Sequence, residues 1–404
     1  MKYEFKKLFS SKLMWAVLML TLGYMVFLPL REVWGSMKTT RRSADTYQAV
    51  LDDVRKNGIT IGELTQMQNE IYQSGLGGNS SYKPKYGKNA VDDLVAIDRA
   101  ISLIGYCQSS FEQNRRELVK GMIYQNITEK KNPRPDSSLI STNEKAIELY
   151  NRRTSLQLKS TGVSADTQYA IFNYSMWEYV MIALCVLMTV RLYSCEYAKG
   201  AFRLVNTGRR TLQSLFFKKF LTVWITAVTT LIVQSAFELA AAKAVFGLKN
   251  LSLPLQQIQM FEYCPYAVSI AQFYLIKLAL RVLSYTALIS LCALVTTLVK
   301  KPLLSSALLL PLCAGGLLAN MVLFVRINNH QDTRAAVLKT YDALRIALPQ
   351  SLLNVKEYLK KFDYFSLFGK PVSRLAACIT IAAALCALCL ALGYKSSGKI
   401  RRKA

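Results

Sequence analysis

Few residues of this 404-residue chain have the types and spacing that catalysis needs. Residues 393–400 read GYKSSGKI, which matches the glycine and lysine spacing of a phosphate-binding loop. Such a loop also needs a strand before it and Ser or Thr directly after its lysine. Here an apolar run precedes the stretch and Ile400 follows the lysine. We therefore interpret it as a basic tail and expect no ATP site in this chain.

Histidine and cysteine give little basis for catalysis or metal binding. His330 is the only histidine in the sequence, which excludes HExxH zinc sites and histidine-dependent catalytic triads. Cys386 and Cys389 form a CxxC pair, but a structural zinc site needs four ligands. We interpret these cysteines, like those of the other apolar runs, as small buried side chains. We expect no enzyme activity, no metal and no cofactor.

The segment CEYAKGAFRLVNTGRRTLQSLFFKK, residues 195–219, is the most distinctive charged stretch. It contains one acid, Glu196, and six Lys or Arg residues, and it lies between two apolar runs. Basic charge alone lets such a segment fix the topology of a membrane protein. Its glycines, at positions 200 and 208, also permit turns within the segment.

Apolar helices have to position these residues, because charged residues avoid long windows of a chain whose net charge is +26. Runs of 18 or more uncharged, mainly apolar residues are typical of transmembrane helices. Five windows contain no charged residue, and a sixth contains only Glu178. The sequence therefore predicts an all-α polytopic membrane protein with six transmembrane helices. The windows are Leu13–Leu30, Tyr169–Val190, Phe220–Phe237, Val282–Val299, Pro302–Val325 and Leu375–Tyr394.

Basic residues orient these predicted helices. If both termini are inside, the inner segments are 1–12, 191–219, 300–301 and 395–404, which carry 18 Lys and Arg against two acids. Inner loops of membrane proteins are enriched in Lys and Arg, so we expect an N-in, C-in arrangement. The predicted parts are an interfacial helix and first span (1–33), an extracellular domain (34–168) and five further spans (169–404), with a cytoplasmic loop at 191–219 and outer loops at 246–267 and 326–371.

The extracellular domain is predicted to be mainly helical. Apolar residues at helical spacing predict one long helix over about Asn89–Met122. An isolated helix with one apolar stripe is marginal in water, so the stripe needs a partner, for which Leu51–Ile71 is the candidate. The stripe consists of Leu94, Ile97, Ile101, Ile104 and Phe111.

Four charged residues are expected near the outer ends of predicted spans: Glu178, Glu238, Lys277 and Arg281. Ionisable residues at this depth are costly and have a functional or a pairing role. Structural ion pairs, with long side chains reaching the headgroups, are the favoured interpretation. A functional site is the alternative.

Cys107 and Cys264 are the two cysteines that would both face outside. An outer compartment permits disulfides, so one interpretation is a bond between them. The other is a pair of thiols, because spacing in sequence does not establish the geometry that a disulfide requires.

The basic segment resembles the first cytoplasmic loop of ABC-2-type transporter permeases. In that family an acid precedes a glycine by four residues, and a leucine-rich turn, a Gly/Ser–Arg pair and a lysine follow. Here fewer residues separate the glycine from the arginine than in the commonest version, and no proline precedes the arginine. The interfacial helix Met1–Lys12, the six spans and the large outer domain also resemble bacterial members, so the resemblance covers nearly the whole chain. The matching loop residues are Glu196, Gly200, Arg203, Thr207, Gly208 and Arg209.

The resemblance implies the permease subunit of an exporter in a bacterial plasma membrane. Its partners would be a second permease subunit, identical or different, and two copies of a separate ATPase subunit that receives the loop. An amphiphilic substrate (a peptide, lipid or drug) is expected, and no nucleic acid. Two alternatives remain: a non-transporting signalling or mechanotransmission subunit that senses through its extracellular domain, and a membrane scaffold without an ATPase.

Overall fold

The computed structural model describes residues 2–10, 12, 14–21, 23, 40–74, 82–107, 111–152, 177–198, 212–246, 251–328, 335–368 and 370–403. The chain is mostly helical. Its helices are α1 (Lys2–Phe9), α3 (Thr40–Asn57), α4 (Ile61–Gln73), α5 (Ala90–Gly105), α6 (Phe111–Lys130), α7 (Ser137–Asn151), α9 (Trp177–Ala198), α11 (Leu212–Phe246), α12 (Ile270–Val299), α13 (Pro302–Asn328), α14 (Ala335–Ala347), α15 (Lys356–Leu359) and α16 (Arg374–Lys403). The described residues also include three 3-10 turns, η2 (Leu255–Gln257), η3 (Gln259–Phe261) and η4 (Pro349–Leu353), and two strands, β1 (Tyr364–Leu367) and β2 (Lys370–Ser373).

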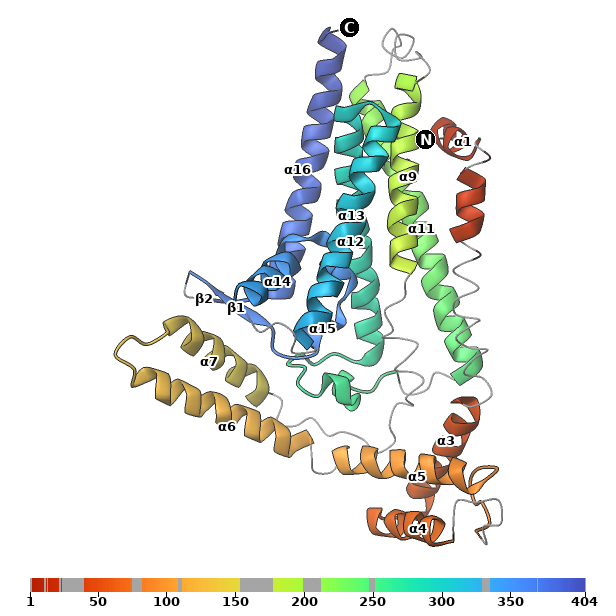
Figure 1. Ribbon diagram of the computed structural model, residues 1–404, viewed down its shortest axis with the longest axis vertical. Coiled ribbons are helices and arrows are strands. Elements are labelled where there is room, and N and C mark those ends of the chain that lie inside the picture. The colour runs from red at the N-terminus through yellow and green to blue at the C-terminus, as the bar shows by residue number, and fades with distance from the viewer. Residues whose placement is uncertain are drawn as a thin grey trace.

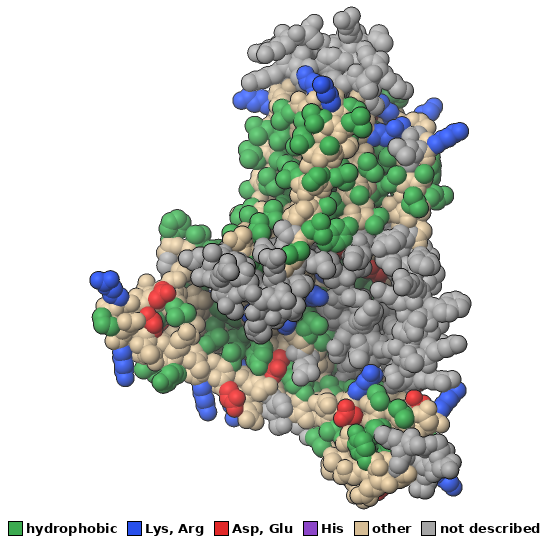
Figure 2. All heavy atoms as spheres, viewed as in Figure 1, with side chains coloured by type: hydrophobic (Ala, Val, Ile, Leu, Met, Phe, Trp, Pro, Cys, Tyr) green, Lys and Arg blue, Asp and Glu red, His purple; other side chains and the backbone are tan. Residues whose placement is uncertain are grey.

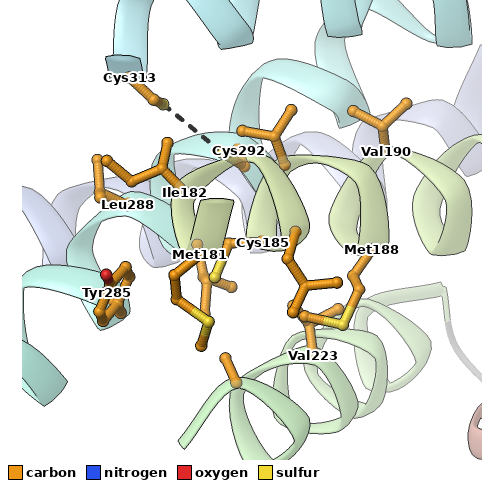
Figure 3. Close-up of a cluster of buried hydrophobic side chains, with 14 of the residues drawn as sticks. Met181, Ile182, Cys185, Met188, Val190, Val223, Tyr285, Leu288, Cys292 and Cys313 are labelled. Atoms are coloured by element: carbon orange, nitrogen blue, oxygen red, sulfur yellow. Dashed lines mark hydrogen bonds between the residues drawn. The ribbon is translucent and has the colours of Figure 1, made fainter. Parts of the chain in front are cut away.

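Helices α9, α11, α12, α13 and α16 run alongside one another as a bundle, and α3–α7 form a helical domain at one end of it (Figure 1). α12 packs against each of the other four bundle helices. In the bundle core, Met181 and Cys185 of α9 lie close to Val223 of α11 and Leu288 of α12 (Figure 3). All four side chains are at most 1% exposed, so this part of the bundle core is apolar.

Among the described residues, three helices are long and apolar enough to cross a membrane: Gln213–Ala240, Ile270–Val299 and Arg374–Ser397. The apolar stretch Pro302–Gly316 of α13 is shorter. Of the predicted first span, Leu13–Leu30, the structure describes residues 14–21 and 23, which are helical. Figure 2 shows hydrophobic side chains over the bundle, with Lys and Arg at the end away from the helical domain. These features are consistent with a membrane protein.

Local sequence signals fix the ends of α12. Ser269 accepts a hydrogen bond from the amide of Gln272, and Gln272 bonds back to the amide of Ser269, which makes a capping box. At the other end Lys300 takes the left-handed conformation (φ 60°) that commonly ends a helix. Pro302 then begins α13, in the position where its missing N–H costs nothing.

The helical domain has its own core, in which α5 packs against α3 and α4. The predicted apolar partners of α5 are confirmed: Ile97 and Leu64 are 0% exposed and belong to one cluster. The candidate partner segment Leu51–Ile71 is not one helix, because Gly58 (φ 68°) ends α3 and a capping box between Thr60 and Glu63 starts α4.

The prediction of one long helix over Asn89–Met122 is wrong. Asn89 does cap α5, and its side chain accepts from the amide of Asp92. However, α5 ends at Gly105, and a new helix, α6, begins at Phe111. α6 packs against α7, and Asn143 donates to Asn126 across this pair (2.9 Å, both side chains buried). The domain therefore consists of a three-helix unit and a two-helix hairpin.

The described residues also include two short strands, β1 and β2, which form an antiparallel hairpin that was not predicted from the sequence. The sequence YFSL of β1 contains Tyr and Phe, which are enriched in strands. Phe368 directly follows β1 in the left-handed region (φ 51°), where a helix cannot continue. The predicted outer segment 326–371 thus includes α14, η4, α15 and most of this hairpin, and its apolar residues Leu352, Val355 and Leu359 are buried.

The segment between α11 and α12 folds into a compact closed loop, residues 251–269. Its two ends pair through Pro254 and Ser269, and the amide of Leu255 donates to the carbonyl of Val268 (2.8 Å). Phe261 of this loop is 0% exposed and packs edge-on against Phe273 of α12, with ring centroids 5.3 Å apart. The closed loop is therefore part of the core at the domain end of the bundle.

Candidate functional site

Most of the basic-segment residues that match the permease family lie outside the described residues: Gly200, Arg203, Thr207, Gly208 and Arg209. Glu196 belongs to α9, but its side chain is not among those described. The structure does describe how the loop is attached. α9 continues to Ala198 and α11 begins at Leu212, so both ends of the predicted loop 191–219 are helical.

The two helices that carry the loop are joined at its base. The hydroxyl of Tyr193 on α9 donates to the backbone carbonyl of Phe216 on α11 (2.8 Å), and the two rings pack edge-to-face at 5.3 Å. The ammonium of Lys219 lies 5.4 Å from the centre of the Tyr193 ring. Tyr193, Phe216 and Lys219 are each 4% exposed or less. Buried aromatic and cation–π contacts of this kind link the two helix ends firmly.

Two further helices brace this base. α1 packs against α9 and α11, with Leu8 fully buried and Glu4 3% exposed. Glu4 interacts electrostatically with Tyr193. On the other side, Gly393 of α16 lies so close to the Phe216 ring that a Cβ there would overlap it. A displacement of the loop would therefore be transmitted to α1, α9, α11 and α16, because close-packed protein interiors have low compressibility and transmit strain.

A buried polar cluster lies in the same bundle, nearer the helical domain. Glu178 of α9 and Arg281 of α12 form an ion pair of 2.6 Å, with side chains only 5% and 3% exposed. The hydroxyl of Tyr285, one turn further along α12, donates to the other oxygen of Glu178. A charge this deep needs such partners, because desolvation otherwise outweighs its attraction.

The cluster extends to α11. Gln234 accepts a hydrogen bond from Arg281 (3.4 Å) and donates one to Glu238 (2.6 Å). Lys277 lies one helical turn before Arg281 and interacts electrostatically with Glu178 and Glu238. The four charged residues that were predicted near the outer ends of spans thus belong to one electrostatic cluster, which connects α9, α11 and α12.

Sequence reasoning missed Gln234 and Tyr285. Both had a signal: Gln234 precedes Glu238 by four residues, and Tyr285 follows Arg281 by four. Residues four apart lie on the same face of a helix, so each extends a polar stripe already marked by a charge. The Arg281 side chain contacts Glu178 and is buried, which favours structural pairing over reaching the headgroups.

Cys107 and Cys264 are thiols in the structure, with no disulfide between them. The amide of Gln257, in the closed loop, donates to the Sγ of Cys107 (3.1 Å), and burial raises the pKa of the Cys107 thiol to about 11. Elsewhere, the Sγ atoms of Cys292 and Cys313 lie 4.0 Å apart in the bundle (Figure 3). Within the described part of the chain, no group of three His, Cys, Asp or Glu side chains is placed to hold a metal ion.

Besides the Gln257–Cys107 contact, further hydrogen bonds attach the helical domain to the closed loop. The hydroxyl of Tyr106 donates to the carbonyl of Gln256 (2.9 Å), and that of Tyr150 to the carbonyl of Tyr263 (2.7 Å). Asn114 donates to the carboxylate of Glu262 (2.6 Å). These bonds come from the end of α5, from α6 and from α7, so both units of the domain are fixed to the bundle.

Comparison with known proteins gives no family for this arrangement. No protein-family model, curated protein or solved structure matches the chain.

Proposed function

We propose that the chain is the membrane-spanning permease subunit of an ABC-2-type exporter. It would cross a bacterial plasma membrane six times, with both termini in the cytoplasm and the helical domain outside. A separate ATPase subunit, in two copies, would bind the basic loop between α9 and α11. A second permease subunit, identical or different, would complete the transporter, and ATP hydrolysis in the partner would drive export of an amphiphilic peptide, lipid or drug.

The observation that carries this proposal is the braced base of the basic loop. Tyr193, Phe216 and Lys219 join the ends of α9 and α11, while α1 and Gly393 of α16 pack against the same point. A loop that served only to fix topology would need charge but no such bracing. A loop that transmits force from a partner needs a rigid attachment to several helices, because coupling requires elements that move together.

The distribution of charge supports the proposed orientation. α1, the α12–α13 turn and the end of α16 lie at the end of the bundle opposite the helical domain (Figure 1). The turn carries Lys300 and Lys301, and the last ten residues of the sequence contain five Lys or Arg. Lys and Arg gather at this end of the surface in Figure 2 as well. Basic residues beside spans favour the cytoplasmic side.

A second candidate is a signalling or mechanotransmission subunit, and one observation favours it. The hydrogen bonds of Tyr106, Asn114 and Tyr150 fix the helical domain to the closed loop, which packs on α12. A ligand that moved the domain would therefore act on the bundle directly. The domain in this case would be a sensor rather than part of an export path.

ATP turnover distinguishes these candidates. The chain is purified in mild detergent from its native membrane, reconstituted in liposomes, and assayed for ATP hydrolysis. An exporter subunit should bring an ATPase whose turnover rises when amphiphilic substrates are added and accumulate inside inverted vesicles. Turnover that responds to an outside ligand without any accumulation would favour the signalling subunit. Absence of an ATPase would contradict both and leave the membrane scaffold.

A further inference from the structure

Among the described residues outside the bundle, the large apolar side chain with the greatest exposure lies at the tip of the β1–β2 hairpin. Phe368 is 96% exposed and Leu367 is 47% exposed. Phe368 also has a positive φ of 51°, a conformation that bulky side chains rarely adopt. A large exposed aromatic ring on a strained turn indicates that this tip contacts a partner.

The base of the hairpin is fixed to the bundle. Asp363 accepts hydrogen bonds from the guanidinium groups of Arg345 on α14 (2.6 Å) and Arg374 at the start of α16 (3.0 Å). The amide of Arg374 also donates to the carbonyl of Asp363 (3.1 Å), and the hydroxyls of Tyr364 and Tyr266 lie 3.1 Å apart. The tip therefore has a defined position relative to α16.

That position is the boundary of an apolar helix. β2 ends at Ser373, and the candidate membrane span Arg374–Ser397 begins at the next residue. The hairpin projects sideways from this end of α16 (Figure 1). If α16 crosses a bilayer, the hairpin lies at the level where the span enters it, which is where aromatic side chains of membrane proteins gather.

The hairpin is also amphipathic. Residues paired across the strands share a face, and Phe365 opposite Val372, followed by Leu367 opposite Lys370, make one face mainly apolar. Lys360, Lys361 and Lys370 are exposed near it, while the carboxylate of Asp363 is already paired with two arginines. A basic rim beside exposed apolar side chains fits the headgroup layer of an anionic bilayer.

We infer that the β1–β2 hairpin is an interfacial anchor, which inserts Leu367 and Phe368 into the bilayer leaflet where α16 begins and places its lysines among anionic headgroups. It holds the start of α16 at a constant depth, and because α7 packs against both strands it also sets the distance of the helical domain from the membrane surface. This role goes beyond the proposed transport function and does not depend on an ATPase.

The test is the depth of a tryptophan at the tip. Phe368→Trp, and Leu367→Trp as a second position, are reconstituted as full-length chains in liposomes that carry a nitroxide near the headgroup. Tyr72→Trp, on the distant helix α4 and 56% exposed, is the matched control. The chain has four native tryptophans, so quenching is measured against the unsubstituted protein.

We expect the lipid nitroxide to quench the added fluorescence of both tip variants and to leave that of Tyr72→Trp almost unchanged, with the reverse order for acrylamide in the water. Quenching at the tip should increase with the phosphatidylglycerol content, and changing all three of Lys360, Lys361 and Lys370 to Gln should remove this increase. Tip variants quenched by acrylamide as strongly as the control would overturn the anchor. Protection from both quenchers would overturn it too, because it would mean that protein, such as a second copy of the chain, covers the tip.

Discussion

Glu178 of α9 and Arg281 of α12, 103 residues apart in the sequence, form a 2.6 Å ion pair whose side chains are almost entirely shielded from solvent. Tyr285 donates to the same carboxylate, and Gln234 of α11 accepts from the same guanidinium. The pair and these two hydrogen-bond partners connect three helices of the bundle, and losing one member leaves the other buried charge without its ion-pair partner.

Arg281→Gln should therefore lower the free energy of unfolding by about 3–5 kcal/mol, and Glu178→Gln by a similar amount. The double variant with both changes should be more stable than either single variant, because neither charge then remains alone. Thermal unfolding of the purified protein in detergent measures these differences. Lys243→Gln, at an exposed position of α11, is the control and should change little. Additive losses in the double variant would contradict the pairing.

Asp93 organises the segment before α5 in the helical domain. It is 0% exposed and accepts from the amides of Lys85, Tyr86 and Gly87 and from the hydroxyl of Tyr82 (2.9 Å). Asp93→Ala leaves these donors unsatisfied, which costs about 1–3 kcal/mol for each that stays buried.

Hydrogen exchange measured by mass spectrometry should show faster exchange in residues 82–89 of the Asp93→Ala variant. Asp98→Ala is the control, because Asp98 is an exposed acid of the same helix and accepts its hydrogen bond from Gln68 of α4 (3.2 Å). Equal exchange in both variants would mean that the segment is stable without Asp93.

Cys107 should react slowly with alkylating reagents. Burial raises the pKa of its thiol to about 11, and only the thiolate is a nucleophile. At pH 8 about 0.1% of such a thiol is ionised, against about a quarter of a thiol with the ordinary pKa of about 8.5.

The alkylation rate of the Cys107 peptide, followed by mass spectrometry, should keep rising with pH up to about pH 11. The alkylation rate of Thr128→Cys, at an exposed position of α6, should instead level off near pH 9, because a solvent-exposed thiol keeps its ordinary pKa of about 8.5. The same plateau for both cysteines would show that Cys107 is not buried against Gln257.

The proposed orientation places α6 outside and the α12–α13 turn inside. A membrane-impermeant maleimide added to intact cells should label Thr128→Cys and should label Lys301→Cys only after the membrane is opened. Both positions are exposed, so access decides the result rather than burial. Labelling of Lys301→Cys in intact cells would contradict the N-in, C-in arrangement.

Periodicity in the sequence predicted the packing of the helical domain well but not its helix ends. The stripe that includes Ile97 and Ile104 is buried against α3 and α4, as expected. Phe111 was assigned to the same stripe, but it begins α6 and packs edge-on to Tyr106 instead. Spacing alone cannot reveal this, because apolar residues on two successive helices can by chance keep one helical period.

The charged cluster shows the same limit in another form. The sequence identified Glu178, Glu238, Lys277 and Arg281 as costly charges, but their partners depend on how α9, α11 and α12 pack. The β1–β2 hairpin was missed because its strands have four residues each and lie between helical segments. A segment this short has too little alternation to separate a strand from a helix.

Co-purification of an ATPase with loop variants tests the central claim most directly. The tagged chain is expressed in its native host and isolated from the membrane in mild detergent, and bound ATPase is measured by ATP hydrolysis and by stoichiometry. The unchanged chain should bring one ATPase subunit per permease subunit, and Glu196→Lys or Arg209→Glu should release it, because inverting one charge of a docked pair costs about 2–5 kcal/mol. Lys243→Gln should retain it. An unchanged chain that purifies without any ATPase, or loop variants that retain it at full stoichiometry, would contradict the account.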